Sequence, residues 1–92
     1  MTIAEEHRVT IDHDTIRRWA EERDGYAATV TGSHSGEEPG VLRIGFEGDE
    51  GLERIGWDAF FEKFEEKALA MRYHNEPPES GSDRFHEFFK RR

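Results

Sequence analysis

The loop "GSHSGEEPG" carries side chains whose types could support nucleophilic chemistry. His34 stands between Ser33 and Ser35, and a hydroxyl beside an imidazole is the starting pair for a nucleophile and its base. Such a pair also needs a third group that orients the base, and neighbours in a turn-rich loop rarely point at one another. We therefore expect a solvated hairpin loop over residues 32–40. If that loop is ordered, Ser33, His34 and Ser35 become the expected ligand contacts.

Two acidic clusters could hold a cation. His13 lies between Asp12 and Asp14, which would suit a metal ligand or an acid–base pair, but Asp12 or Asp14 also suits the first turn of a helix. A second cluster lacks the spacing of an EF-hand and would serve equally as hydrated surface. Its members are Glu47, Asp49, Glu50 and Glu53. We expect no catalytic residue, no metal and no cofactor.

The C-terminal segment is locally basic. It holds Arg84, Lys90, Arg91 and Arg92 against a single acid, Glu87. Cations of this kind could contact a nucleic-acid backbone or an acidic partner, and they also suit the C-terminus of a helix. A nucleic-acid surface would be larger if Arg17, Arg18 and Arg43 shared the same face.

The composition limits the class of protein. The 92 residues suffice for one domain, and the 21 acidic against 13 basic residues give a formal charge of −8. Only three basic residues are lysine, and an acid-rich, lysine-poor surface is typical of halophilic proteins. The absence of cysteine excludes disulfides and thiolate sites. No apolar run is long enough for a membrane span and no signal core is present, so we expect a cytoplasmic protein.

Periodicity predicts most of the elements. Ile16, Trp19 and Ala20 predict a helix that begins near Asp12 and stops at Gly25. Residues 26–31 and 41–46 alternate with a period of two and predict an antiparallel hairpin, followed by a loop at 47–51. A stripe of aromatic residues then predicts a helix that ends near Lys67. It consists of Trp57, Phe60, Phe61 and Phe64.

The remaining segments complete an α+β domain. The period of two returns over 68–74 and predicts a third strand. Phe85, Phe88 and Phe89 stand at helical spacing and favour a short closing helix over 82–91, with a fourth strand as the alternative. We expect residues 1–11 to form a flexible arm, although "HRVTI" could add a strand. Residues 12–92 then form a single domain in the order α-β-β-α-β-α, with a small antiparallel sheet of about three strands and two to three helices on one face.

Much of the chain resembles a family of small uncharacterised prokaryotic proteins. Their pattern contains "DHxTIRRWAEERGG", "PGVLRI.F" and "ISWxxFFxKFEE..LA..Y", which this chain matches over most of residues 12–91. It departs at Asp24, where the pattern has Gly, at Gly56, where it has Ser, and at Phe89, where it has Val. Such proteins often carry the label 1,4-alpha-glucan branching enzyme. That chemistry needs paired carboxylates around a sugar cleft on a barrel of about 250 residues, which 92 residues cannot build.

The sequence therefore favours a non-enzymatic module that binds a protein partner or a second copy of itself. Eleven aromatic residues are many for a domain of this size, and some are expected to remain exposed. The expected contact residues are Phe61, Phe85, Phe88 and Phe89. The alternatives are an accessory nucleic-acid binder that uses the basic segment, and a small-ligand protein or enzyme that uses the 32–40 loop.

Overall fold

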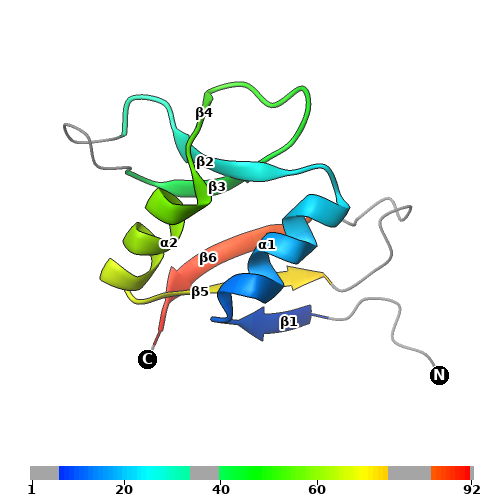
Figure 1. Cartoon of the computed structure of the whole chain (residues 1–92), viewed down its shortest axis with the longest axis vertical. Coiled ribbons are helices and arrows are strands. Elements are labelled where there is room, and N and C mark those ends of the chain that lie inside the picture. The colour runs from blue at the N-terminus through cyan, green and yellow to red at the C-terminus, as the bar shows by residue number, and fades with distance from the viewer. Residues whose placement is uncertain (1–6, 34–39, 75–83, 92) are drawn as a thin grey trace.

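The computed structural model describes residues 7–33, 40–74 and 84–91 (Figure 1). Two helices and six strands follow one another along this part of the chain, which confirms the α+β class. Their order is β1 (His7–Thr10), α1 (His13–Glu22), β2 (Tyr26–Val30), β3 (Leu42–Gly45), β4 (Leu52–Arg54), α2 (Trp57–Glu66), β5 (Leu69–His74) and β6 (His86–Lys90).

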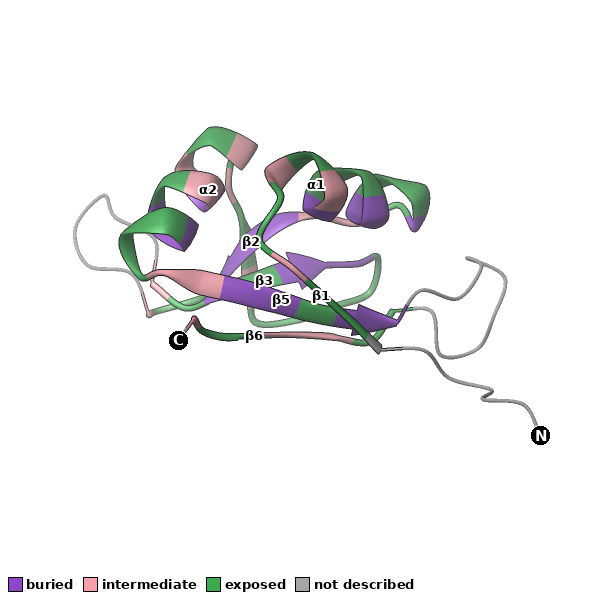
Figure 2. Cartoon of the chain, turned by 90° about the horizontal axis from the view of Figure 1, so that it is seen from below, coloured by how far each residue is buried: buried purple, intermediate pink, exposed green. Residues whose placement is uncertain are grey.

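The strands form two antiparallel sheets of three strands each. Sheet A has the order β1-β5-β6, with His7 opposite His74 and Leu69 opposite Lys90. Sheet B has the order β3-β2-β4, with Thr29 opposite Leu42. Figure 2 shows both helices on the same side of the molecule, with their buried residues turned toward the strands. The predicted placement of the helices on one face is therefore present, but it spans two sheets instead of one.

The two helices begin and end where local chemistry requires. Asp12 caps α1, because its carboxylate accepts a 2.9 Å hydrogen bond from the N–H of Thr15. Gly56 caps α2 in an extended conformation without a side-chain bond. After α2 the chain turns through Ala68 at a φ of 52°, a left-handed conformation that ends a helix. Strand β5 then begins at Leu69.

The core lies between the helices and the two sheets. Ile16 from α1, Phe60 and Phe64 from α2, and Met71 from β5 are all 0% exposed. Trp19 fixes α1 to sheet A because its Nε1–H donates a 2.9 Å hydrogen bond to the carbonyl of His74. The predicted aromatic stripe of α2 is thus core at Phe60 and Phe64, while Trp57 and Phe61 pack at its edge.

The predicted closing helix is wrong. Residues 86–90 form strand β6, and the 82–83 start of that helix lies outside the described residues. Phe88 packs against the core, whereas its neighbour Phe89 is on the opposite side of the strand and 37% exposed. A strand with apolar residues on both faces mimics helical spacing, which explains the error.

Two further predictions need correction. Residues 7–10 of the expected flexible arm form strand β1, because the edge of β5 offers them a ladder of main-chain hydrogen bonds. Residues 1–6 lie outside the described part. Strand β4 was not expected, since its three residues hold one apolar side chain, Leu52. It pairs with β2 and completes sheet B.

Within the described part of the chain, neither helix is long and apolar enough to cross a membrane.

Candidate functional site: a groove lined by all three lysines

A hollow of about 320 Å³ opens between the two sheets. One wall is the start of β3 with Val41, Leu42 and Arg43, next to the loop ends Ser33 and Gly40. The other wall consists of Lys67, Leu69 and Phe88. The hollow therefore borders an edge strand of sheet B and an edge strand of sheet A.

A second hollow of about 480 Å³ adjoins the first, since Lys67 and Leu69 line both. Its other lining residues are Lys63, Glu66 and Lys90. We call the two together the lysine groove. Every lysine of a chain with a formal charge of −8 lies in it, although Lys63 and Lys67 come from the end of α2 and Lys90 comes from β6.

The three lysines have different surroundings. The side chain of Lys63 is 8% exposed, and its Nζ lies 2.9 Å from Glu66, whose pKa it holds below the usual value. Within residues 7–33, 40–74 and 84–91, no ion pair joins Lys67 or Lys90 to a carboxylate. Cations near the end of α2 complement the helix dipole, which accounts for Lys63 and Lys67. The helix dipole does not account for Lys90, which comes from β6. The charge of Lys90 in the groove therefore has no role in stabilising α2.

The floor of the groove is continuous with the core. The ring of Phe88 makes edge contacts with Phe60 and Phe64 at centroid distances of 5.7 and 6.2 Å. Leu69 and Leu42 border the same space. An apolar group that enters the groove would therefore meet core side chains, while a negative group would meet Lys67 and Lys90. Such a pairing of apolar floor and charged rim is typical of binding sites.

Ser33, the described member of the predicted ligand loop, has a structural role. Its hydroxyl donates to the carbonyl of Val30 at 2.6 Å and accepts from the N–H of Val41 at 3.0 Å. The hydroxyl of Ser33 therefore links Val30 to Val41, in place of a direct bond from the N–H of Val41 to the carbonyl of Val30. Gly40 lies so close that a Cβ there would overlap the main chain of Ser33. His34 and Ser35 lie outside the described residues.

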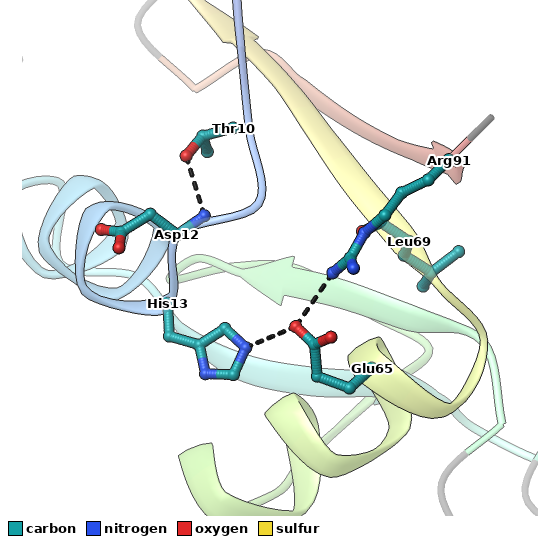
Figure 3. A network of polar contacts seen from close by, with 6 residues as sticks. All are labelled: Thr10, Asp12, His13, Glu65, Leu69 and Arg91. Carbon is teal, nitrogen blue, oxygen red and sulfur yellow. Dashed lines mark hydrogen bonds and ion pairs between the residues drawn. The ribbon is translucent and has the colours of Figure 1, made fainter.

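His13 belongs to a polar network that ties three elements together (Figure 3). Its Nε2 lies 2.7 Å from Oε2 of Glu65 on α2, and Arg91 donates to the same oxygen at 2.9 Å. The imidazole also stacks on Phe61 with a centroid distance of 4.1 Å. The hydrogen bonds from Arg91 and His13 hold the pKa of Glu65 below its usual value. Neighbouring Asp12 and Asp14 do not share in these contacts, and Asp12 acts as the helix cap.

The predicted basic patch is divided by the strand that carries it. Arg91 is held by Glu65 and by the carbonyl of Leu69, and Lys90 lines the lysine groove. Arg84 lies before the other end of β6, where its guanidinium stacks over the ring of Phe46. Because a strand rises by about 3.3 Å per residue, Arg84 is far from Lys90. Arg92 lies outside the described residues. Of the other arginines considered, Arg17 pairs with Glu21.

The four predicted contact phenylalanines do not share one surface. Phe61 packs against His13, and Phe88 lies in the groove floor. Phe85 contacts His74 and is 37% exposed. Phe89 lies opposite Ala70, on the face of sheet A that points away from Phe88. The lysine groove thus brings together three of the predicted site residues: Phe88, Lys90 and Ser33.

Sequence reasoning missed His86, which bridges the two sheets. Its Nε2 accepts a 3.2 Å hydrogen bond from the N–H of Ile44, and its Nδ1 lies 3.1 Å from the carbonyl of Arg84. These partners require a neutral ring that carries its proton on Nδ1. Burial lowers the pKa of His86, and Arg43 lowers it further. The only signal in the sequence was its place in a phenylalanine-rich segment, directly after Phe85, which does not distinguish it.

In the described part of the chain, no three His, Asp or Glu side chains converge as a metal site would require. No family model, curated protein or solved structure matches the chain, so the site must be interpreted from its own geometry.

Proposed function

We propose that the protein is a non-enzymatic interaction module and that it binds a protein partner through the lysine groove. The observation that carries the proposal is the gathering of Lys63, Lys67 and Lys90 around an opening to the core in a strongly acidic chain. Positive side chains that gather at one place on an otherwise acidic surface steer a negatively charged partner to that place.

The apolar part of the groove supports binding of a macromolecular segment. Phe88, Leu69 and Val41 supply contact area, and Val41 is 47% exposed. Aromatic and aliphatic side chains surrounded by charges make up the energetic centre of many protein interfaces. The hydroxyl of Ser33 donates to a carbonyl and holds the hairpin closed, which favours binding over nucleophilic chemistry at this site.

The setting proposed for this module is the cytoplasm of a halophilic cell. The charge of −8 with only three lysines suits a surface that stays hydrated in concentrated salt. Salt weakens long-range attraction between exposed charges, so the apolar floor would supply most of the affinity there.

The experiment uses affinity capture from a nuclease-treated lysate at the salt concentration of the source cell. We expect a stoichiometric protein that is retained by the wild type and lost with Val41→Glu/Lys67→Glu/Lys90→Glu, which puts a charge into the apolar part of the groove and also reverses its charged rim. Arg18→Glu is the control, because Arg18 is an exposed cation on α1, outside the groove. Equal capture by the groove variant and the control would overturn the proposal. Recovery of nucleic acid in place of protein would favour the nucleic-acid alternative.

Self-association is a second candidate because of one face of sheet A. Val9 is 59% exposed and opposite Arg72, and Phe89 is 37% exposed and opposite Ala70, so both lie on the side away from the core. Light scattering after size exclusion tests this candidate directly. A dimer that Phe89→Ser converts to a monomer supports it, and a monomer at every concentration removes it.

A further inference from the structure

The lysine groove is a gap between two strand edges. Strand β3 is at the end of sheet B and β6 is at the end of sheet A. The two are joined where the N–H of Ile44 meets His86, and both Leu42 and Phe88 line the groove beyond that contact. Residue numbers fall along β3 as they rise along β6, so the two edges run antiparallel on either side of the gap.

Main-chain groups on the β3 side point into this gap. The N–H of Val30 donates to the carbonyl of Val41, which makes these two a hydrogen-bonded pair of the ladder. Because pairing alternates along antiparallel strands, Leu42 and Ile44 direct their N–H and C=O groups away from β2. The bond from the N–H of Ile44 to His86 has the expected direction.

The same alternation holds on the β6 side. The N–H of Arg91 donates to the carbonyl of Ala68, so residues 89 and 87 face β5 in the ladder. Phe88 and Lys90 therefore direct their main-chain groups away from β5. Outside the strand ladders, no hydrogen bond among residues 7–33, 40–74 and 84–91 involves the N–H of Leu42 or the main chain of Phe88, while the carbonyl of Leu42 accepts a 3.1 Å bond from the side chain of Arg43.

We propose that the occupant of the groove is an extended, acidic segment of a protein partner, which adds to β3 as a further strand at Leu42. The inference rests on the proposed function and specifies its mode. Strand addition supplies main-chain hydrogen bonds to an open edge, and alternate side chains enter the pockets beside it. In this groove an apolar side chain meets Leu69 and Phe88, and flanking carboxylates meet Lys67 and Lys90.

His86 sets one end of the added strand. The N–H of Ile44 is already bonded to its ring, and the N–H of Gly40 donates to the hydroxyl of Thr29 at 3.1 Å. Among these three residues, the N–H of Leu42 is therefore the donor that an added strand can use. The segment that fits is short, and its specificity comes from charge and from one apolar anchor. An aliphatic residue between acidic residues has this chemistry, whereas a basic segment would be repelled by Lys67, Lys90 and Arg43.

The probe is the capped peptide acetyl-Glu-Glu-Val-Glu-Glu-amide, titrated into ¹⁵N-labelled protein at low salt. One comparison peptide has Lys at each Glu, and another has N-methylated main-chain amides on both sides of Val. We expect binding of the acidic peptide alone, weakened about tenfold or more by Lys67→Glu/Lys90→Glu. Arg18→Glu serves again as the matched control. We also expect amide exchange of Leu42 to slow at least about tenfold when the acidic peptide is bound.

The results separate the mode from the function. Equal binding of the N-methylated peptide, with unchanged exchange at Leu42, would overturn strand addition while leaving the groove as a binding site for acidic partners. Failure of the acidic peptide to bind at millimolar concentration would overturn the inference, and lysate capture would still decide whether the groove binds a partner. Equal binding of the basic peptide would refute charge as the basis of recognition.

Discussion

The imidazole of His86 on β6 accepts the main-chain N–H of Ile44 on β3 at 3.2 Å, and this bond joins the edges of the two sheets. The acceptor is the unprotonated Nε2 of a neutral ring, with Nδ1 near the carbonyl of Arg84. Protonation of Nε2 at low pH would turn this acceptor into a donor, so that the ring N–H would face the N–H of Ile44 and the bond would be lost. The junction of the sheets is therefore sensitive to acid.

We expect acid to destabilise the protein through His86. Burial is the main cause that lowers the pKa of His86 below its ordinary value of 6.5, so the unfolded chain binds the proton at higher pH than the folded one. Stability should therefore rise as the pH increases from the pKa of the folded state to about 6.5, and then level off. Urea denaturation between pH 4.5 and 7.5 measures this, and His86→Gln should remove that part of the dependence. An NMR midpoint for His86 at or above 6.5 would contradict the prediction.

Glu65 should contribute a small, salt-sensitive stabilisation. Its carboxylate makes hydrogen bonds with Arg91 and His13, and both bonds hold the pKa of Glu65 below the ordinary 4.5. The contribution is present above pH 4.5 and is lost as the pH falls through the lowered pKa. Glu65→Gln should reduce Tm slightly at low salt and less in molar salt, because exposed pairs are screened. Glu62→Gln, on the exposed side of the same helix, is the control, and equal losses in both variants would argue against the network.

Gly56→Ser should stabilise the protein. Gly56 caps α2 with φ −76° and ψ 155°, no side-chain bond is made there, and a Cβ would meet nothing within 4 Å. A serine hydroxyl can accept an N–H of the first turn, and it also restricts the unfolded chain. We expect a gain of about 0.5 to 1 kcal/mol. Chemical denaturation of Gly56→Ser beside Gly56→Ala tests the cap, since alanine restricts the chain but accepts no bond. A serine variant no more stable than the alanine variant would show that no cap forms.

Salt should raise the stability of the whole protein. A charge of −8 repels itself in the compact state, and the Debye length falls from about 10 Å at 0.1 M to about 3 Å at 1 M. We expect Tm to increase from 0.1 to 2 M KCl, and to increase less in Glu47→Gln/Glu50→Gln, because both residues are exposed acids. A flat or falling Tm in the wild type would remove the argument for a halophilic surface.

The elements with a clean period could be predicted from the sequence. Helices α1 and α2 each carry a continuous apolar stripe, and Leu69, Met71 and Tyr73 recur at every second position of β5. Strand β4 has too few residues for a period, and β6 has phenylalanines on both faces, so neither could be recognised. Strand pairing decides such segments, and pairing depends on contacts far away in the sequence.

The groove itself could not be predicted. Lys63 and Lys67 are one helical turn apart, but Lys90 joins them only because β6 pairs with β5 in the observed register. The role of Ser33 was hidden for a similar reason, since its partner Val41 lies across the loop. The sequence showed the scarcity of lysine, and the structure shows where the three of them meet.

The strand order of sheet A also has a kinetic consequence. Strand β5 lies between β1 and β6, so His7 must find His74 across most of the described chain before this sheet is complete. Pairings between such distant segments give a high contact order, and small domains of that kind fold in milliseconds to seconds, more slowly than helical bundles. While β1 is still unpaired, the edge of β5 is open to other chains. Rapid refolding in the microsecond range would therefore be unexpected for this domain.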